Sequence, residues 1–169
     1  MKKSILVIST LDTKGQETLY LKNKLRAIGL EPILMDISGR GSDIVDIDIH
    51  ASRVVAAGGW KFEEMQNSRD RTRVTNTLMK GGSRLAAELM DERKLDGVIA
   101  LGGSTGSLMA TEIMRSLPFG IPKVMISSTA ALPGLSTRYI GTGDIVLFHS
   151  VVQSQHKGVI GRPGHQGQP

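Results

Sequence analysis

The sequence contains no cysteine, and this absence removes three kinds of chemistry together. Disulfide bonds, thiolate metal sites and cysteine nucleophiles are all excluded. Aromatic residues make up only 4% of the chain, so the core must be built mainly from aliphatic side chains. The same scarcity leaves few platforms on which nucleic-acid bases could stack.

Long apolar runs are also missing. After Met1-Lys2-Lys3, the apolar stretch before Asp12 is too short for the core of a signal peptide. It is far shorter than the roughly 20 residues that cross a bilayer. We therefore expect a cytoplasmic protein that has no membrane partner.

The 169 residues suit a single domain, because 40% are hydrophobic and can supply an ordinary core. The net charge is +5, yet the basic residues are dispersed and no nucleic-acid-binding module is recognisable. Nucleic acid is therefore not expected as a partner, whereas a mild basic excess suits a protein that binds anions. One stretch is denser in basic residues and contains Arg69, Arg71, Arg73, Lys80 and Arg84.

Short apolar runs alternate with segments of helical periodicity along the chain. The runs predict strands at 4–9, 32–37, 98–101 and 122–127, and at least one more short strand within 139–141 and 145–148. The periodic segments predict helices at 19–30, 75–94 and 107–117, whereas 60–70 is polar and resembles a loop. This alternation indicates an α/β fold, with a doubly wound, mostly parallel sheet in a Rossmann-like three-layer sandwich. We expect one nucleotide-binding domain over 1–152 and a disordered tail over 153–169, which is rich in glycine and proline.

The sharpest local signal lies between an expected strand and an expected helix, at Gly102-Gly-Ser-Thr-Gly106-Ser107. Glycines allow a tight turn with positive φ, and they let an anion approach the backbone. The first N–H groups of a helix lack intrahelical partners and lie at the positive end of its dipole. A tight turn that binds nothing is the alternative, and the run has neither the Walker A lysine nor the dinucleotide glycine spacing. We predict a phosphate-binding loop whose members are Gly102, Gly103, Ser104, Thr105, Gly106 and Ser107.

A second candidate loop, Asp12-Thr13-Lys14-Gly15, follows the first expected strand. Lys14 can meet a phosphate as a point charge, and Thr13 can cap a helix or donate to a ligand. The alternative is an ordinary helix start with an exposed lysine. Both loops leave the carboxyl ends of expected parallel strands, where α/β sheets open a ligand crevice. We therefore predict that Thr13, Lys14 and Gly15 face the first loop, and that Arg71 is a further candidate for the phosphate tail.

Metal and catalytic constellations are not recognisable in the sequence. The aspartates between 43 and 48 lack the glycine turn and the terminal glutamate of a calcium loop, so a solvated loop is favoured over a metal site. The four histidines show no metal-binding spacing. Asp144 has three open roles, which are a ribose contact, a magnesium contact and the cap of a turn. No metal site is predicted, and the catalytic residues, if any, are unknown.

Five motifs follow one another in an order that resembles a known family. They are Asp12-Thr-Lys-Gly15, Asp70-Arg71, Asp96-Gly97 with Gly102-Gly-Ser-Thr-Gly106, Leu117-Pro-x-Gly-x-Pro-Lys123 and Tyr139-Ile-Gly-x-Gly-Asp-Ile145. Together they resemble the family of the ATP-binding domain of the tomato mosaic virus resistance protein, which has bacterial, archaeal and plant members. The resemblance covers roughly residues 3–152.

The resemblance implies a Rossmann-like domain that binds ATP, with or without Mg²⁺, and that forms a homodimer. Family members usually continue into a larger domain similar to a TIM barrel, and residues 153–169 depart from that continuation. No settled reaction comes with the family, so whether the protein is an enzyme stays open. We predict a domain that binds ATP or a related phosphate ligand. A hydrolase or transferase acting on small phosphate compounds, and a protein-interaction module with a structural nucleotide, are the alternatives.

Overall fold

The computed structural model describes residues 2–44 and 46–150, and the tail expected to be disordered lies outside them. Strands and helices alternate along this part of the chain, as the apolar pattern predicts. Their order is β1 (Ser4–Ser9), α1 (Leu11–Ala27), β2 (Glu31–Asp36), α2 (Ala51–Ala57), α3 (Phe62–Gln66), α4 (Arg71–Asp91), β3 (Gly97–Gly102), α5 (Ser104–Arg115), β4 (Lys123–Ser127), α6 (Leu135–Ile140) and β5 (Val146–His149).

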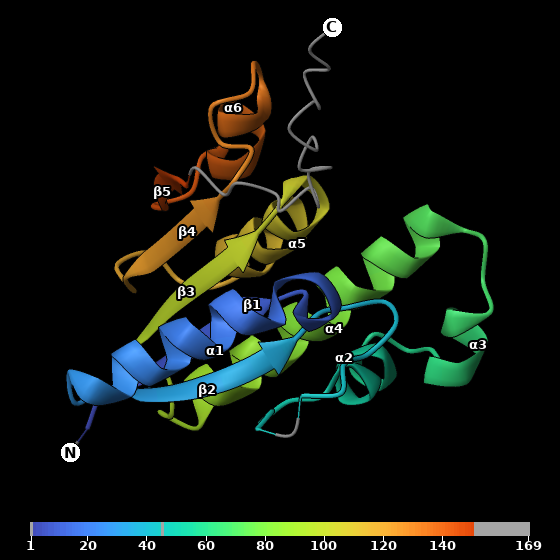
Figure 1. The fold of residues 1–169 in the computed structure, drawn as a ribbon, viewed down its shortest axis with the longest axis horizontal. Helices are drawn as coiled ribbons and strands as arrows, with labels where there is room; N and C mark the ends of the chain where they lie inside the picture. Colours follow the sequence, from blue (N-terminus) through green and yellow to red (C-terminus); the bar gives the residue numbers. More distant parts are fainter. Residues whose placement is uncertain (1, 45, 151–169) are drawn as a thin grey trace, which may run out of the picture.

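The described strands form one five-stranded sheet in the order β2-β1-β3-β4-β5, and every pairing is parallel (Figure 1). Central strands of a parallel sheet are buried on both faces, which explains why β1 reads as an unbroken aliphatic run. In β1, Leu6, Val7 and Ile8 are fully buried. The predicted doubly wound α/β class is therefore confirmed.

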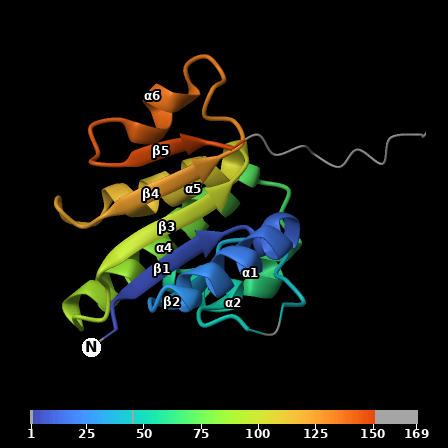
Figure 2. The ribbon, with the colours of Figure 1, turned by 60° about the vertical axis from the view of Figure 1, so that its left-hand side comes forward.

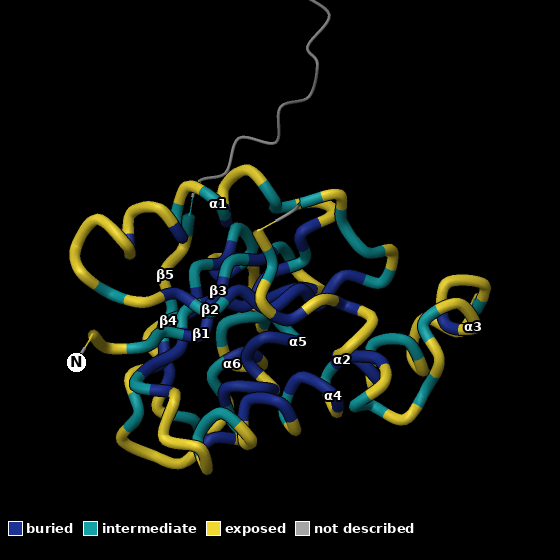
Figure 3. The backbone as a smooth tube through the Cα atoms, turned by 90° about the horizontal axis from the view of Figure 1, so that it is seen from below, coloured by how far each residue is buried: buried dark blue, intermediate teal, exposed yellow. Residues whose placement is uncertain are grey.

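Helices cover both faces of this sheet and make it a three-layer sandwich (Figure 2). Helix α1 packs on one face, over β1 and β2, through a core cluster that includes Val7, Leu25 and Leu34. Helices α2, α4 and α5 lie on the other face, over a larger cluster that includes Leu6 and Ile113. Figure 3 shows the buried segments gathered between these layers. None of the described helices is long and apolar enough to cross a membrane.

Two glycines bring helices α2 and α4 into direct backbone contact. A Cβ added to Gly81 would lie 1.8 Å from the carbonyl oxygen of Val54. A Cβ added to Gly58, the C-cap of α2, would lie 2.3 Å from the carbonyl oxygen of Thr77. Gly81 and Gly82 therefore do not interrupt α4, and Gly81 allows α2 to approach it.

Several predicted elements differ from the structure. Helix α1 begins at Leu11 instead of residue 19, and helix α5 begins at Ser104 instead of Ser107. Helix α4 begins at Arg71 instead of Thr75, because the carboxylate of Asp70 caps it by accepting a hydrogen bond from the N–H of Arg73 at 2.9 Å. The polar stretch 60–70 contains the short helix α3. The expectation of at least one more short strand within 139–141 and 145–148 is met by β5 in the second segment, whereas Tyr139 and Ile140 end helix α6.

Candidate functional site

The candidate site lies where the connections of the sheet diverge. The chain leaves β1 through α1 toward β2, and it leaves β3 through α5 toward β4, on the other side. In doubly wound sheets this divergence opens a crevice outside the carboxyl ends of the two central strands. This point of divergence is the topological switch point of the sheet. It lies between Ser9, which ends β1, and Gly102, which ends β3.

The start of helix α5 presents free backbone donors at this switch point. Its N-cap is Gly103, an extended residue (φ −84°, ψ −158°) that has no side chain to cap the helix. The first N–H of α5 that bonds within the helix is that of Ser107, to the carbonyl of Gly103 at 2.8 Å. Among the described residues, the N–H groups of Ser104, Thr105 and Gly106 have no protein acceptor. When no side chain caps the start of a helix, its first N–H groups can donate hydrogen bonds to an anion.

The glycines of this loop let neighbouring atoms approach the backbone closely, and the positive φ that glycine allows is not used here. Gly102, Gly103 and Gly106 are not among the glycines with positive φ. A Cβ on Gly102 would lie 2.7 Å from the nitrogen of Ser107, so the strand must enter α5 without a side chain there. A Cβ on Gly106 would approach Thr10 to 3.4 Å, which shows how closely α5 lies to the end of β1.

Ser107 has a structural role that the sequence did not reveal. The residue is fully buried, and its hydroxyl donates a hydrogen bond to the hydroxyl of Ser127, at the end of β4, at 2.7 Å. Its side chain is therefore engaged inside the protein and does not line the crevice. The part of the predicted loop that lines the crevice runs from Gly103 to Gly106.

The crevice is a cavity of about 360 Å³ between the two candidate loops. Thr13 lies in its wall as predicted, with its hydroxyl 3.0 Å from that of Thr10. Asp12 belongs to the second candidate loop but was given no role there. Thr75 was missed, and its only signal was its position near the start of α4. The full lining comprises Thr10, Asp12, Thr13, Ile37, Gly39, Val74, Thr75, Leu78, Gly103, Ser104, Thr105, Gly106 and Met109.

Lys14 and Gly15 are not part of this lining. The ammonium of Lys14 forms an ion pair with Glu17 at 3.1 Å, and its φ of −125° marks a kink in α1. A Cβ on Gly15 would lie 2.5 Å from the side chain of Ile44, so this glycine allows the loop after β2 to pack on α1. The structure therefore brings only Thr13 of the three predicted residues to the crevice.

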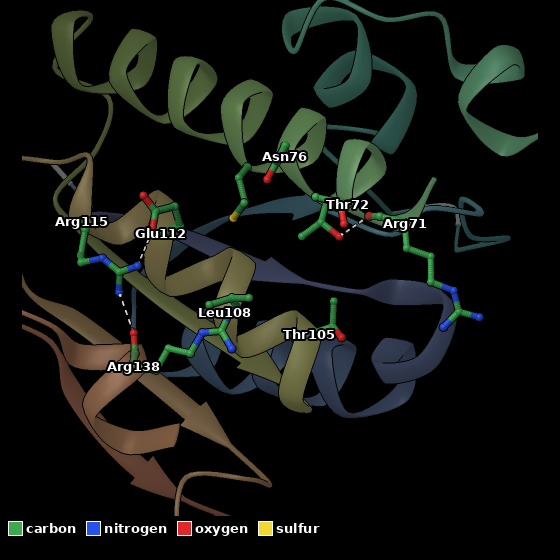
Figure 4. Close-up of a pocket in the computed structure, with 10 residues that line it drawn as sticks. Arg71, Thr72, Asn76, Thr105, Leu108, Glu112, Arg115 and Arg138 are labelled. Atoms are coloured by element: carbon green, nitrogen blue, oxygen red, sulfur yellow. Dashed lines mark hydrogen bonds and ion pairs between the residues drawn. The ribbon is translucent and has the colours of Figure 1, made fainter. Parts of the chain in front are cut away.

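Arg71 lies in a neighbouring cavity of about 550 Å³ between α4 and α5, here called the helix cavity. Figure 4 shows Arg71 and Arg115 at opposite ends of this cavity, with Thr105 at the start of α5 between them. Arg115 forms an ion pair with Glu112 and donates a hydrogen bond to the carbonyl of Tyr139. Thr105 lines both this cavity and the crevice, so the two spaces are adjacent.

A buried carboxylate holds the start of α1 in place beside the crevice. Asp36 is 1% exposed and accepts hydrogen bonds from the N–H of Leu11 at 3.2 Å and from the N–H of Ser38 at 2.9 Å. The hydroxyl of Ser38 donates a third bond at 3.0 Å. Burial raises the pKa of the Asp36 carboxyl above its ordinary value, although these hydrogen bonds partly oppose the shift.

We expect Asp36→Asn to become more stable relative to the wild type as pH rises. The variant keeps an oxygen for the two N–H donors, and its amide can donate to Ser38. Because the pKa of Asp36 is raised, the folded state binds the proton more tightly than the unfolded chain, and this stabilisation is lost as pH increases above about 4. Urea unfolding between roughly pH 4 and pH 7 measures the difference, and a difference that does not change with pH would contradict it.

The remaining aspartates of interest pair with buried lysines. Lys22 is fully buried in α1, and its ammonium lies 3.1 Å from the carboxylates of both Asp46 and Asp48. Asp144 lies 2.6 Å from the ammonium of buried Lys123 and also accepts the N–H of Gly120 at 2.8 Å. These aspartates therefore neutralise buried cations. In the part of the chain that is described, no group of three or more acidic or histidine side chains could hold a metal ion.

The fold is a doubly wound α/β domain in which the first N–H groups of helix α5 lie free at the switch point of the sheet. The model of the uncharacterised protein family UPF0261, N-terminal domain, matches residues 3–159. The chain belongs to this family.

Relatives support the assignment. A UPF0261 protein of Clostridium tetani is 37% identical over 152 residues, which are 90% of this chain and 37% of the relative. A UPF0261 protein of Rhizobium meliloti is 34% identical over 149 residues, which are 88% of this chain and 36% of the relative. The ToMV resistance protein Tm-1(GCR237) of Solanum lycopersicum is 56% identical over 62 residues, which are 37% of this chain and 8% of that protein. The chain thus spans little more than a third of the length of these bacterial relatives.

Proposed function

We propose that this domain binds ATP or a related nucleotide, and that the phosphates lie against the start of helix α5. The observation that carries the proposal is the set of free N–H groups of Ser104, Thr105 and Gly106 behind a bare N-cap at the switch point. Thr13 and the hydroxyls of Ser104 and Thr105 would add donors. ATP is abundant in the cytoplasm, which is the location we propose.

Arginines beside the crevice support an anionic ligand at this end of the sheet. The chain carries a net charge of +5, and Arg71 and Arg138 both line the helix cavity beside the crevice. A guanidinium can bind phosphate with two parallel hydrogen bonds, which favours arginine beside a polyanion. The apolar side chains of Met79 and Leu108 line the same cavity and offer a surface for the base.

ATP should therefore stabilise the folded protein. A ligand present at about 100 times its dissociation constant adds about 2.7 kcal/mol to the free energy of unfolding. For a chain of this size, the melting temperature should rise by about 5–10 °C. Thermal unfolding is measured with millimolar ATP, ADP and AMP, with and without Mg²⁺, and with adenosine as the control that lacks phosphate. An unchanged melting temperature with all three nucleotides would overturn the proposal.

We also propose that the domain forms a homodimer through strand β5. In the described residues β5 pairs only with β4, and it leaves Val146 and Phe148 54% and 57% exposed. Apolar side chains on an unpaired edge strand favour association. Sedimentation equilibrium tests the state in solution, and a monomer at every concentration would refute this assembly.

A further inference from the structure

A second cavity beside the crevice is strongly basic. It has a volume of about 630 Å³ and is here called the arginine cavity, because Arg40, Arg69 and Arg71 line it. No aspartate or glutamate is among the described residues of its wall. Three guanidinium groups around one cavity favour the binding of an anion.

The three arginines are available to a ligand. Within residues 2–44 and 46–150, none of them forms an ion pair, whereas Arg26 and Arg115 pair with carboxylates. Asp70, which lies between two of them in the sequence, is used to cap α4 and does not line the cavity. Three like charges around one cavity repel each other, and an anion would relieve this repulsion.

Their positions are set by three separate segments. Arg40 comes from the loop after β2, Arg69 from the turn before α4, and Arg71 from the first position of α4. The side chain of Gln66 donates a hydrogen bond to the carbonyl of Arg40 at 2.9 Å, and so joins α3 to the loop after β2. The cavity is thus formed by segments that the fold holds together.

The arginine cavity is adjacent to the crevice. Thr75 and Thr105 line both spaces, so a ligand with one phosphate at the start of α5 can extend past them toward the arginines. A guanidinium binds phosphate oxygens in a bidentate fashion and stays charged at all ordinary pH values. A chain of several phosphates offers groups for both sets of donors, whereas a monophosphate offers only one group.

We propose that the arginine cavity binds the outer phosphates of the ligand, and that the protein therefore selects triphosphates over monophosphates. This inference rests on the proposed function, because it takes the start of α5 as the first phosphate site. It adds a second anion site and a preference among nucleotides. Arg40 and Arg69 provide this preference, together with Arg71.

The test removes two charges from the cavity and compares three ligands. The variant is Arg40→Gln combined with Arg69→Gln, which leaves the start of α4 intact. The matched control is Arg53→Gln combined with Arg84→Gln, which removes two exposed arginines that do not line this cavity. Calorimetric titrations at fixed ionic strength use ATP, AMP and inorganic tripolyphosphate. We expect the cavity variant to bind ATP and tripolyphosphate about tenfold more weakly or worse, and AMP within about twofold of the wild type.

Each outcome separates this inference from the proposed function. If ATP and AMP lose affinity equally, or if the control variant loses as much as the cavity variant, the second anion site is refuted and nucleotide binding stands. If the wild type binds tripolyphosphate through these arginines but binds no nucleotide, the anion site stands and the proposed function fails. If the wild type binds none of the three ligands, both are refuted.

Discussion

Gly103→Asp is expected to lower the affinity for ATP by about a hundredfold or more while leaving the fold intact. Gly103 is the N-cap of α5, and its extended backbone is one that aspartate adopts readily at this position. The new carboxylate would accept the free N–H groups of Thr105 or Gly106 and would repel a phosphate. Stability of the unliganded protein should change by only a few tenths of a kcal/mol, in the stabilising direction.

Two uncharged variants of Gly103 distinguish steric blocking of the phosphate from its repulsion by a carboxylate. A Cβ on Gly103 has open space, since its nearest neighbour is the hydroxyl of Ser128 at 3.9 Å. Gly103→Ala should therefore fold normally and lose less affinity than Gly103→Asp, with Gly103→Val between them. Circular dichroism and calorimetric titration with ATP give fold and affinity. Undiminished affinity in a folded Gly103→Asp protein would mean that α5 does not bind the phosphates.

Gly81→Ala should destabilise the protein although alanine is the better helix former. In an exposed helix this change would stabilise by about 1 kcal/mol. Here the new Cβ would lie 1.8 Å from the carbonyl oxygen of Val54, which is backbone and cannot rotate away. We expect the free energy of unfolding to fall by about 2 kcal/mol, which corresponds to about 4–8 °C in melting temperature.

The control for this prediction is the neighbouring exposed residue of the same helix. Lys80→Ala changes an exposed position of α4 and should alter stability by no more than about 0.5 kcal/mol. Urea unfolding of both variants gives the comparison. A Gly81→Ala protein as stable as the wild type would show that α2 and α4 do not need their close contact.

Much of the fold was predictable, because strands buried on both faces read as unbroken aliphatic runs. The runs at β1, β3 and β4 predicted the parallel sheet correctly. The helix ends were harder, since polar residues such as Asp12 and Lys14 form the first turns of α1 and resemble a loop in the sequence. The short run at Tyr139 does not distinguish strand from helix by its pattern, and the structure places it in α6.

Only those residues of the candidate site that directly follow a strand could be predicted from the sequence. The loop from Gly103 to Gly106 and Thr13 both follow strands, and the structure places them in one crevice. The buried role of Ser107 depends on Ser127, which is distant in the sequence. Arg40 and Arg69 contribute to one cavity only because α3 and α4 are brought beside the end of β2, and the sequence contains no local signal of that contact.

The most direct test of the central claim is to observe the amides of α5 while ATP is added. In a titration of ¹⁵N-labelled protein followed by two-dimensional NMR, the amide signals of Ser104, Thr105 and Gly106 should show the largest shifts. They should saturate together, and inorganic tripolyphosphate should shift the same signals. If ATP binds and saturates other signals while these three do not move, or if no signal moves at millimolar ATP, the start of α5 is not a phosphate site.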